Sequence, residues 1–346
     1  MSVLIDIEKK LSGYDLKVNI EGDNEVTALL GASGCGKSMT LKCIAGIEKP
    51  DRGRIIADGR VLFDSEKHIN VPPEKRNVGL MFQNYALFPN MTVRQNICAG
   101  ARRKNSDRNV RCSKAEMYMD YFGIRDIADR LPKYISGGQQ QRTALARILV
   151  SEPDILLLDE PFSALDSHLR FATEQEVRKV IREFGRTVIM VSHDRDEVFR
   201  MADRIAVINN GIIEKYASRD EVFRSPGTVN GAILTGCKNI SPIKKIDERH
   251  ILALDWNLLL ETAEDVGNSA YAGIRMHYVN GSAPVNSYEC VVTDVIENPF
   301  SYTVMLMAEG GSEKAFGWEM EKDKWRQIRG DRVMIHIPPE SVLLLR

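Results

Sequence analysis

The feature that most constrains this chain is a glycine-rich loop at residues 31–38. Its sequence, Gly31-Ala32-Ser33-Gly34-Cys35-Gly36-Lys37-Ser38, matches the phosphate-loop pattern G-x-x-x-x-G-K-[ST]. The apolar run Val26–Leu30 before it predicts a strand, and the pattern of Ser38–Ile47 after it predicts a helix. Backbone N–H groups of such a loop surround phosphate oxygens, and the helix points its positive end at the anion. We therefore expect a polyphosphate site in which Lys37 supplies a cation and the Ser38 hydroxyl binds Mg²⁺.

A second element ends in two acidic residues. Ile155–Leu158 is a continuous apolar run, which is typical of a parallel strand buried on both faces, and Asp159 and Glu160 follow it directly. An aspartate at the end of such a strand can hold Mg²⁺ through water, and its neighbour can polarise an attacking water. We therefore predict Asp159 as a metal ligand and Glu160 as a catalytic residue.

The third element is Ser136-Gly137-Gly138-Gln139, which precedes the helical pattern of Gln140–Val150. Small residues before a helix predict a second anion site at the helix N-terminus. In its order and spacing relative to the first two elements, this stretch resembles the Leu-Ser-Gly-Gly-Gln signature of the ATP-binding cassette (ABC) ATPases, with Ile135 in place of the leucine.

Three shorter motifs extend the resemblance. Met81-Phe82-Gln83 resembles the Q-loop of the family, Ser163-Ala164-Leu165-Asp166 its D-loop, and Val191-Ser192-His193-Asp194 its H-loop. The family's glutamine contacts Mg²⁺ and the attacking water, its D-loop crosses to the other subunit, and its histidine contacts the γ-phosphate. The resemblance implies the same roles for Gln83, Asp166 and His193.

The resemblance covers residues 1 to about 230 and implies ATP hydrolysis with ATP and Mg²⁺ as cofactors. It also implies a nucleotide-sandwich homodimer, in which Ser136 and Gly138 of one chain face the ATP of the other. The residues expected to bind the nucleotide are Gly31, Ala32, Ser33, Gly34, Cys35, Gly36, Lys37, Ser38, Met39, Ser136, Gly137, Gly138, Gln139 and Asp166. The expected catalytic residues are Glu160, His193 and Gln83, and the expected metal ligands are Ser38, Gln83 and Asp159.

The residue that stacks on the adenine stays open. The family uses an aromatic residue upstream of the phosphate loop, and the upstream aromatic of this chain is Tyr14, 17 residues before Gly31. Tyr14 lies in the strand-like run Tyr14–Val18, so a place in the core or on a strand surface is the alternative to adenine stacking.

The fold class follows from two contrasting patterns. Residues 1–230 alternate strands and helices, which predicts an α/β P-loop NTPase cassette with a mixed sheet, a RecA-like core and a helical subdomain. Residues 231–346 contain short runs rich in Val, Ile, Tyr and Thr, such as Ile251–Leu260, Gly273–Val279 and Ser287–Ile296. Turn residues, including Gly310-Gly311, separate them, which predicts an all-β, barrel-like domain of the OB or TOBE kind.

Charge and composition limit the kinds of partner and location that we expect for this chain. The 47 Lys and Arg against 48 Asp and Glu give a net charge of −1, so no basic field favours nucleic acid. No apolar run reaches the roughly 18–20 residues of a membrane span, and the N-terminus lacks the pattern of a secretion signal. The six cysteines form no Cys-x-x-Cys pair, which favours reduced thiols and no structural metal.

The expected place of work is nevertheless the cytoplasmic face of a membrane. The apolar stretch Gln83–Val93 resembles the surface on which these ATPases dock permease subunits, with ordinary core packing as the alternative. The permease would in turn receive solute from an extracytoplasmic solute-binding protein. A basic stretch, Arg102–Arg111, is interpreted as a solvated loop, with contact to anionic lipid as the alternative.

Of all these expectations, the sequence constrains the identity of the transported solute least. Gly236–Ile240 and Ala272–His277 resemble stretches of molybdate and sulfate importer ATPases, in which the β domain is regulatory. We therefore expect an importer of molybdate, tungstate or sulfate. The alternatives are an importer of a sugar, a polyamine, iron or phosphate, and a non-transport ABC ATPase.

Overall fold

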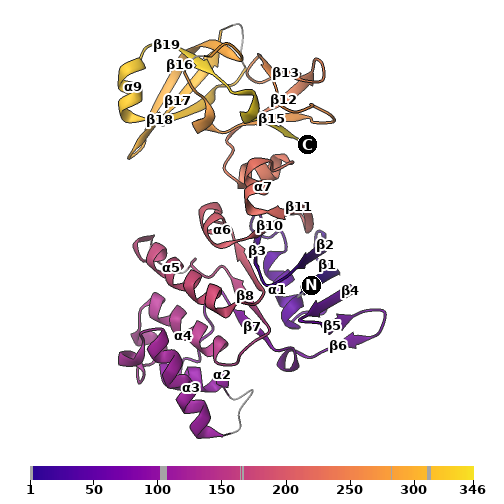
Figure 1. Ribbon diagram of the computed structural model, residues 1–346, viewed down its shortest axis with the longest axis vertical. Coiled ribbons are helices and arrows are strands. Elements are labelled where there is room, and N and C mark those ends of the chain that lie inside the picture. The colour runs from indigo at the N-terminus through magenta and orange to yellow at the C-terminus, as the bar shows by residue number, and fades with distance from the viewer. Residues whose placement is uncertain (1–2, 102–106, 164, 166, 282, 310–312) are drawn as a thin grey trace. The chain divides into compact units, whose positions relative to one another are not determined.

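The structure is a computed structural model that describes residues 3–101, 107–163, 165, 167–281, 283–309 and 313–346 (Figure 1). Arg102, Arg103 and Lys104 of the basic stretch, Ala164 and Asp166 of the D-loop-like motif, and the turn Gly310-Gly311 lie outside these residues. The chain divides into two compact units, residues 1–219 and 220–346. Within the described ranges, no helix combines the length and the apolar character that crossing a bilayer requires.

One mixed sheet forms the centre of the first unit. In spatial order its strands are β6 (Ile69–Asn70), β5 (Arg60–Asp64), β4 (Arg52–Ala57), β1 (Val3–Lys10), β2 (Asp15–Gly22), β11 (Ile212–Ser218), β10 (Arg204–Asn209), β3 (Val26–Leu30), β9 (Val188–Ser192), β8 (Ile155–Asp159) and β7 (Val78–Met81). The five strands from β7 to β10 pair in parallel, whereas β6, β5, β4, β1 and β2 pair antiparallel. The carboxyl ends of the parallel strands therefore open at one edge, where ligands of α/β sheets bind.

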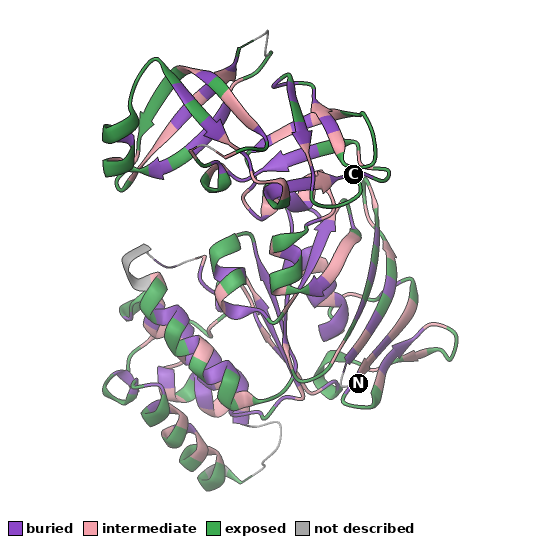
Figure 2. Ribbon diagram, turned by 45° about the horizontal axis from the view of Figure 1, so that its top comes forward, coloured by how far each residue is buried: buried purple, intermediate pink, exposed green. Residues whose placement is uncertain are grey.

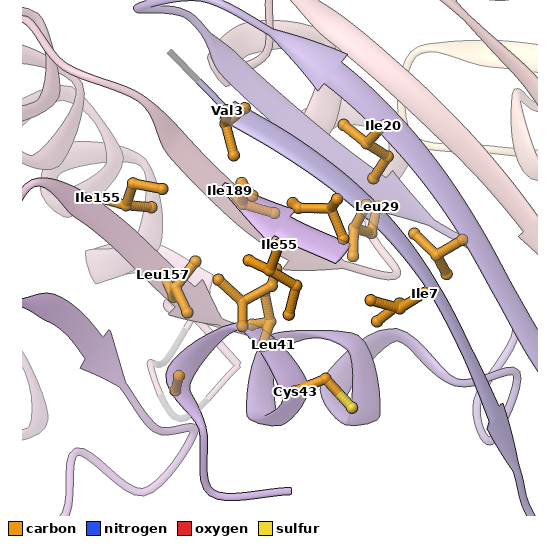
Figure 3. Packing of buried hydrophobic residues seen from close by; sticks show 14 of the residues in the cluster. Val3, Ile7, Ile20, Leu29, Leu41, Cys43, Ile55, Ile155, Leu157 and Ile189 are labelled. Carbon is orange, nitrogen blue, oxygen red and sulfur yellow. The ribbon is translucent and has the colours of Figure 1, made fainter. Parts of the chain in front are cut away.

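The helices of this unit divide into two groups. They are α1 (Lys37–Ala45), α2 (Val93–Ala101), α3 (Arg108–Tyr121), α4 (Gly137–Leu149), α5 (Ser167–Phe184) and α6 (Arg195–Met201), with short 3₁₀ turns η1 (Pro73–Lys75), η2 (Arg125–Ile127) and η3 (Pro132–Tyr134). Helices α2, α3 and α4 pack on one another as a helical subdomain (Figure 1). Leu41 and Cys43 of α1 pack among the sheet residues Leu29, Leu157 and Ile189 (Figure 3). The predicted cassette fold is confirmed.

The second unit is built of two antiparallel sheets. The first has the strand order β14 (Leu258–Glu261), β13 (His250–Ala253), β12 (Asn239–Lys245), β15 (Tyr271–Ile274) and β20 (Val342–Leu345), and the second β18 (Phe316–Glu321), β17 (Ser301–Ala308), β16 (Ser287–Glu297) and β19 (Arg332–His336). Helices α7 (Arg219–Arg224), α8 (Val229–Leu234) and α9 (Lys322–Ile328) and the turns η4 (Met276–Tyr278) and η5 (Pro339–Ser341) complete it.

The two sheets of the second unit share one core. Trp256 lies in the turn between β13 and β14 of the first sheet, and Phe316 begins β18 of the second sheet. Their ring centroids lie 5.7 Å apart. Along several of these strands, buried residues alternate with more exposed ones, as the colours of Figure 2 show. The amide of Asn239 in β12 donates to the Gly317 carbonyl (2.7 Å) and accepts from the Gly317 N–H (2.7 Å), which joins the sheets. The predicted barrel-like, all-β class is confirmed.

Several predicted boundaries are wrong in detail. The run Ile251–Leu260 is not one strand but the hairpin β13–β14, because the chain turns at Asn257, whose φ is +52°. The run Gly273–Val279 leaves β15 after Ile274 and continues into η4. Helix α4 begins at Gly137 instead of Gln140, so the small residues form its first turn. Apolar pattern alone does not mark a turn that an asparagine makes within an apolar run.

Candidate functional site

The phosphate loop connects β3 to α1 and bends back over the carboxyl edge of the sheet. Gly36, the N-cap of α1, has φ +107°, a left-handed conformation that glycine adopts without steric cost. The Lys37 side chain is buried, and its Nζ donates to the carbonyls of Gly31 (2.7 Å) and Ala32 (2.8 Å). The amine is therefore held inside the loop, where it faces the space that the loop encloses.

The first glycine of the loop is required by packing. A Cβ on Gly31 would lie 2.4 Å from the Ile208 carbonyl oxygen of β10 and 2.6 Å from the Cys35 sulfur. Backbone cannot yield at such a distance, so a side chain at residue 31 would displace either the loop or β10.

Tyr14 lies against this loop. It precedes β2, which begins at Asp15, so the predicted strand position is wrong by one residue. Its hydroxyl donates to the Gly34 carbonyl (2.6 Å), and its ring lies close to Gly211. Burial, and then the nearby Cys35, raises the pKa of Tyr14, so the phenol stays a proton donor. Tyr14 therefore borders the phosphate loop, while adenine stacking stays a prediction.

The predicted metal ligands of the first two elements meet at one point. The Ser38 hydroxyl, in the first turn of α1, donates to Asp159 Oδ1 at the end of β8 (2.8 Å). Burial is the largest influence on this carboxyl and raises the pKa of Asp159, against the opposing hydrogen bond from Ser38. A hydroxyl and a carboxylate oxygen in contact are the hard oxygen donors that Mg²⁺ prefers.

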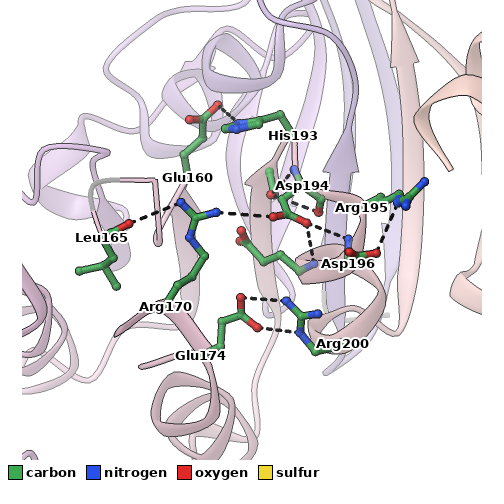
Figure 4. Close-up of polar contacts among 11 residues, drawn as sticks. Glu160, Leu165, Arg170, Glu174, His193, Asp194, Arg195, Asp196 and Arg200 are labelled. Carbon is green, nitrogen blue, oxygen red and sulfur yellow. Dashed lines mark hydrogen bonds and ion pairs between the residues drawn. The ribbon is translucent and has the colours of Figure 1, made fainter. Parts of the chain in front are cut away.

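Glu160 brings three predicted residues together. Its backbone is left-handed, with φ +46°, which turns the side chain away from the strand direction. Gln83 Nε2 donates to Glu160 Oε2 (3.1 Å). On the other side of the carboxylate, His193 Nδ1 lies 3.2 Å from Glu160 Oε1, as Figure 4 shows. Two residues, Gln83 after the end of β7 and His193 after the end of β9, thus contact the Glu160 carboxylate at the end of β8.

The signature-like stretch forms the start of α4. Ser136 is the N-cap: its hydroxyl accepts from Gln139 N (3.4 Å), and Gln139 Oε1 accepts from Ser136 N (3.0 Å), a capping box. In the part of the chain that the structure describes, no hydrogen bond or ion pair joins Ser136–Gln139 to the phosphate loop or to Glu160. One chain therefore brings together Lys37, Ser38, Asp159, Glu160, Gln83 and His193, but not the signature-like stretch.

A charged cluster beside His193 was missed by the sequence analysis. A small pocket is lined by Glu160, Ser163, Arg170, Ser192, His193, Asp194 and Glu197. Arg170 of α5 lies 3.6 Å from the Asp194 carboxylate and donates to the Leu165 carbonyl (3.5 Å), while Arg200 binds the buried Glu174 through two nitrogens (Figure 4). Burial raises the pKa of Glu197 to about 8. No local pattern marks these residues, because α5 and α6 meet only in the fold.

The predicted docking stretch has both buried and exposed members. Tyr85 is buried and Phe88 is exposed, and residues 85 and 86 both have left-handed backbones. Arg147 of α4, which no motif indicated, donates to the carbonyls of Tyr85 and Ala86. The apolar run is thus part core and part surface.

Comparison with known proteins identifies the family. The family "ABC transporter" matches residues 14–163. The trehalose/maltose import ATP-binding protein MalK of Thermococcus litoralis is 35% identical over 304 residues, which cover 84% of this chain and 80% of the relative. The spermidine/putrescine import ATP-binding protein PotA of Oleidesulfovibrio alaskensis is 41% identical over 230 residues, 66% of this chain and 59% of the relative. The chain therefore spans about three fifths of this second relative.

A solved structure supports the same conclusion for the first unit. The dimeric, post-hydrolysis state of the ATP-binding cassette MJ0796 bound to ADP and Pi matches with a TM-score of 0.54 and 29% identity, covering 63% of this chain and 99% of that chain. Together with the clustered motifs, these matches show that the chain belongs to the ABC transporter family, as an ATP-binding ATPase subunit of an importer.

Proposed function

We propose that ATP is hydrolysed between two copies of this chain, with residues 1–230 as the ATPase domain and residues 231–346 as a regulatory domain. The observation that carries the proposal is the contact of both Gln83 and His193 with the Glu160 carboxylate. Ser136–Gln139 stay apart from this group within one chain, so a second copy has to supply them. The dimer described for MJ0796 supports this arrangement.

Each assigned residue has a task that follows from its position. Residues 31–39 cradle the phosphates through backbone N–H groups, and the Lys37 amine moves from the loop carbonyls to phosphate oxygens. Glu160 orients and accepts a proton from the attacking water, while His193 and Gln83 hold its carboxylate in place. Asp166 of the D-loop-like motif is proposed to contact the facing copy.

Mg²⁺ fits the oxygen donors present. Ser38 would hold it directly and Asp159 through water, because their oxygens meet at the end of β8. Gln83, whose amide lies at the neighbouring Glu160 carboxylate, would be a further ligand. When bound, the ion neutralises charge that develops on the phosphates.

The site of action is proposed to be the cytoplasmic face of a membrane, where the chain docks on integral permease subunits through residues 83–93. The exposed Phe88 supports an apolar contact there. An extracytoplasmic solute-binding protein would be an indirect partner.

Two hypotheses differ in the solute that is transported. The stretches Gly236–Ile240 and Ala272–His277 favour an oxyanion, whereas the names of MalK and PotA favour trehalose or maltose, or a polyamine. Molybdate, sulfate, maltose and spermidine can each be added to the full chain while the unfolding temperature is followed. A regulatory ligand raises this temperature by mass action, and the ligand that does so separates the hypotheses.

The decisive experiment on the ATPase is Glu160→Gln. The variant should bind ATP like the wild type, lose hydrolysis by about 100-fold or more, and elute as a dimer with ATP on a sizing column. Glu340→Gln, an exposed carboxylate of the second unit, is the matched control. Hydrolysis at the normal rate in Glu160→Gln would refute the assigned role.

A further inference from the structure

The segment after Gln83 contains an unusual stretch of backbone. Tyr85 has φ +59° and Ala86 has φ +43°, two consecutive left-handed residues without glycine. A Cβ in this region collides with its own backbone, so such residues persist only where the surroundings hold them. The Ala86 N–H bonds back to the Asn84 carbonyl (2.7 Å), which closes a tight turn.

Arg147, in the last turn of α4, holds this turn from outside. Its Nη2 donates to the Tyr85 carbonyl (2.9 Å) and its Nη1 to the Ala86 carbonyl (2.7 Å), so one guanidinium binds both strained residues. The same group lies over the Phe88 ring, 5.3 Å from its centroid. A planar fork that also stacks on a ring is a task that arginine performs and lysine cannot.

The other side of the turn faces the catalytic group. The Tyr85 side chain is 3% exposed, and its hydroxyl donates to the carbonyl of Pro161, the residue after Glu160 (3.5 Å). Two residues before Tyr85, Gln83 donates to Glu160 itself. The turn therefore connects the end of α4 to the position of Gln83 at the Glu160 carboxylate.

We propose that Arg147 is a positioning residue for hydrolysis: by holding the left-handed Tyr85–Ala86 turn, it keeps Gln83 at Glu160. Ser136–Gln139 form the start of α4, and Arg147 lies in the last turn of the same helix. Through this helix, Arg147 also couples the movement of the signature-like stretch to that of the Gln83 segment. The inference rests on the proposed role of Glu160 and Gln83.

The test combines truncation with relief of the strain. Arg147→Ala should lower kcat by about tenfold, with the KM for ATP within about twofold of the wild type, because Gln83 is misplaced while the phosphate loop is untouched. Ala86→Gly alone is measured as the reference for the double variant. Added to Arg147→Ala, it should restore most of kcat, because glycine adopts the left-handed turn without help. Arg130→Ala, an exposed arginine outside this contact, is the control.

Other results overturn the inference. If Ala86→Gly restores nothing, or if Arg147→Ala raises KM at an unchanged kcat, Arg147 does not act through this turn. If Arg147→Ala does not fold, Arg147→Lys replaces it. Lysine keeps the charge and stem but loses the fork, so it should also lower kcat and be rescued by Ala86→Gly. A wild type without ATPase activity would instead refute the proposed function.

Discussion

The two units of this chain differ in how completely their buried polar groups are hydrogen-bonded. In the first unit, several buried side-chain atoms have no hydrogen-bond partner: both amide atoms of Gln141, Nε of Arg170 and Oε1 of Glu197 are examples. All atoms of this kind among the residues that the structure describes belong to the first unit. Gln141 lies in the signature-like helix, while Arg170 and Glu197 line the pocket beside His193.

Buried polar groups of the second unit instead connect its parts. Asn239 bonds twice to Gly317 across the two sheets, and Asn286 bonds to both the N–H and the carbonyl of Glu261 and to the Ile337 carbonyl. Arg275 binds the carbonyls of Thr235 and Phe223, which fastens α7 and α8. The buried polar groups of the second unit thus stabilise one arrangement, whereas the first unit leaves buried polar atoms unsatisfied in the signature-like helix and in the pocket beside His193.

The largest expected effect comes from Lys37. Lys37→Met should lower kcat/KM for ATP by about 1,000-fold, because the buried cation that meets the phosphates is lost. Steady-state ATPase assays measure this, with exposed Lys49→Met as control. The three tryptophans all lie in the second unit, so the unfolding midpoint reported by their fluorescence should stay unchanged. A shifted midpoint would show that the units do not behave separately.

A change at Asn239 should do the opposite: it should lower the stability of the second unit and leave ATP hydrolysis intact. Asn239→Ala leaves the N–H and carbonyl of Gly317 buried without partners, which should destabilise the second unit by about 2–4 kcal/mol. Urea unfolding followed by tryptophan fluorescence checks this, with the exposed neighbour Lys238→Ala as control. Basal ATP hydrolysis per folded molecule should persist. Loss of hydrolysis together with stability would contradict the division of tasks.

A pH-dependent effect is expected from Glu197. Its pKa is raised to about 8 by burial, so the folded chain keeps this proton between its ordinary pKa near 4.5 and about 8, while the unfolded chain releases it. Stability is therefore lost as pH rises through this window, by about 1.4 kcal/mol for each unit of pKa shift at most.

Glu197→Gln cannot titrate and keeps the shape of the protonated acid. The gain in unfolding temperature over the wild type should be smallest near pH 5, grow up to about pH 8 and then level off. Scanning calorimetry at several pH values measures it. A gain that is constant across this range would mean that the Glu197 carboxyl is not protonated in the fold.

The smallest expected effect is at Gln141. The side chain is fully buried with neither amide atom bonded, so Gln141→Met should stabilise the first unit by about 1 kcal/mol. Thermal unfolding followed by far-UV circular dichroism measures the change. Destabilisation instead would mean that the amide has a partner in solution, and the contrast between the units would then be weaker than described.

Local patterns predicted the parts of the molecule that depend on neighbouring residues. Val26–Leu30 was predicted with its observed bounds, because a strand buried on both faces needs an unbroken apolar run. The phosphate loop, Asp159 and Glu160 were likewise marked by residues beside one another in the chain. Their proximity to Gln83 and His193 follows because all end parallel strands of one sheet.

Contacts between distant segments could not be predicted in this way. Arg147 lies 61 and 62 residues from the carbonyls that it binds, and Tyr85–Ala86 adopt a glycine-like turn without glycine. Arg170 and Glu197 acquire their roles only where α5 meets α6. Such residues look like ordinary members of helices, because periodicity records burial but not the identity of a partner.

The close approach of Gly31 to Ile208 has a consequence for how this protein can vary. A library that randomises residues 31–38 and selects only for folded protein, without any demand for ATP binding, should still recover glycine at residue 31. The phosphate loop therefore carries two independent constraints at this residue, one from its ligand and one from a strand that begins more than 170 residues later in the chain. Because the contact is with a backbone carbonyl, the demand for glycine at residue 31 holds whatever side chain the strand carries at residue 208.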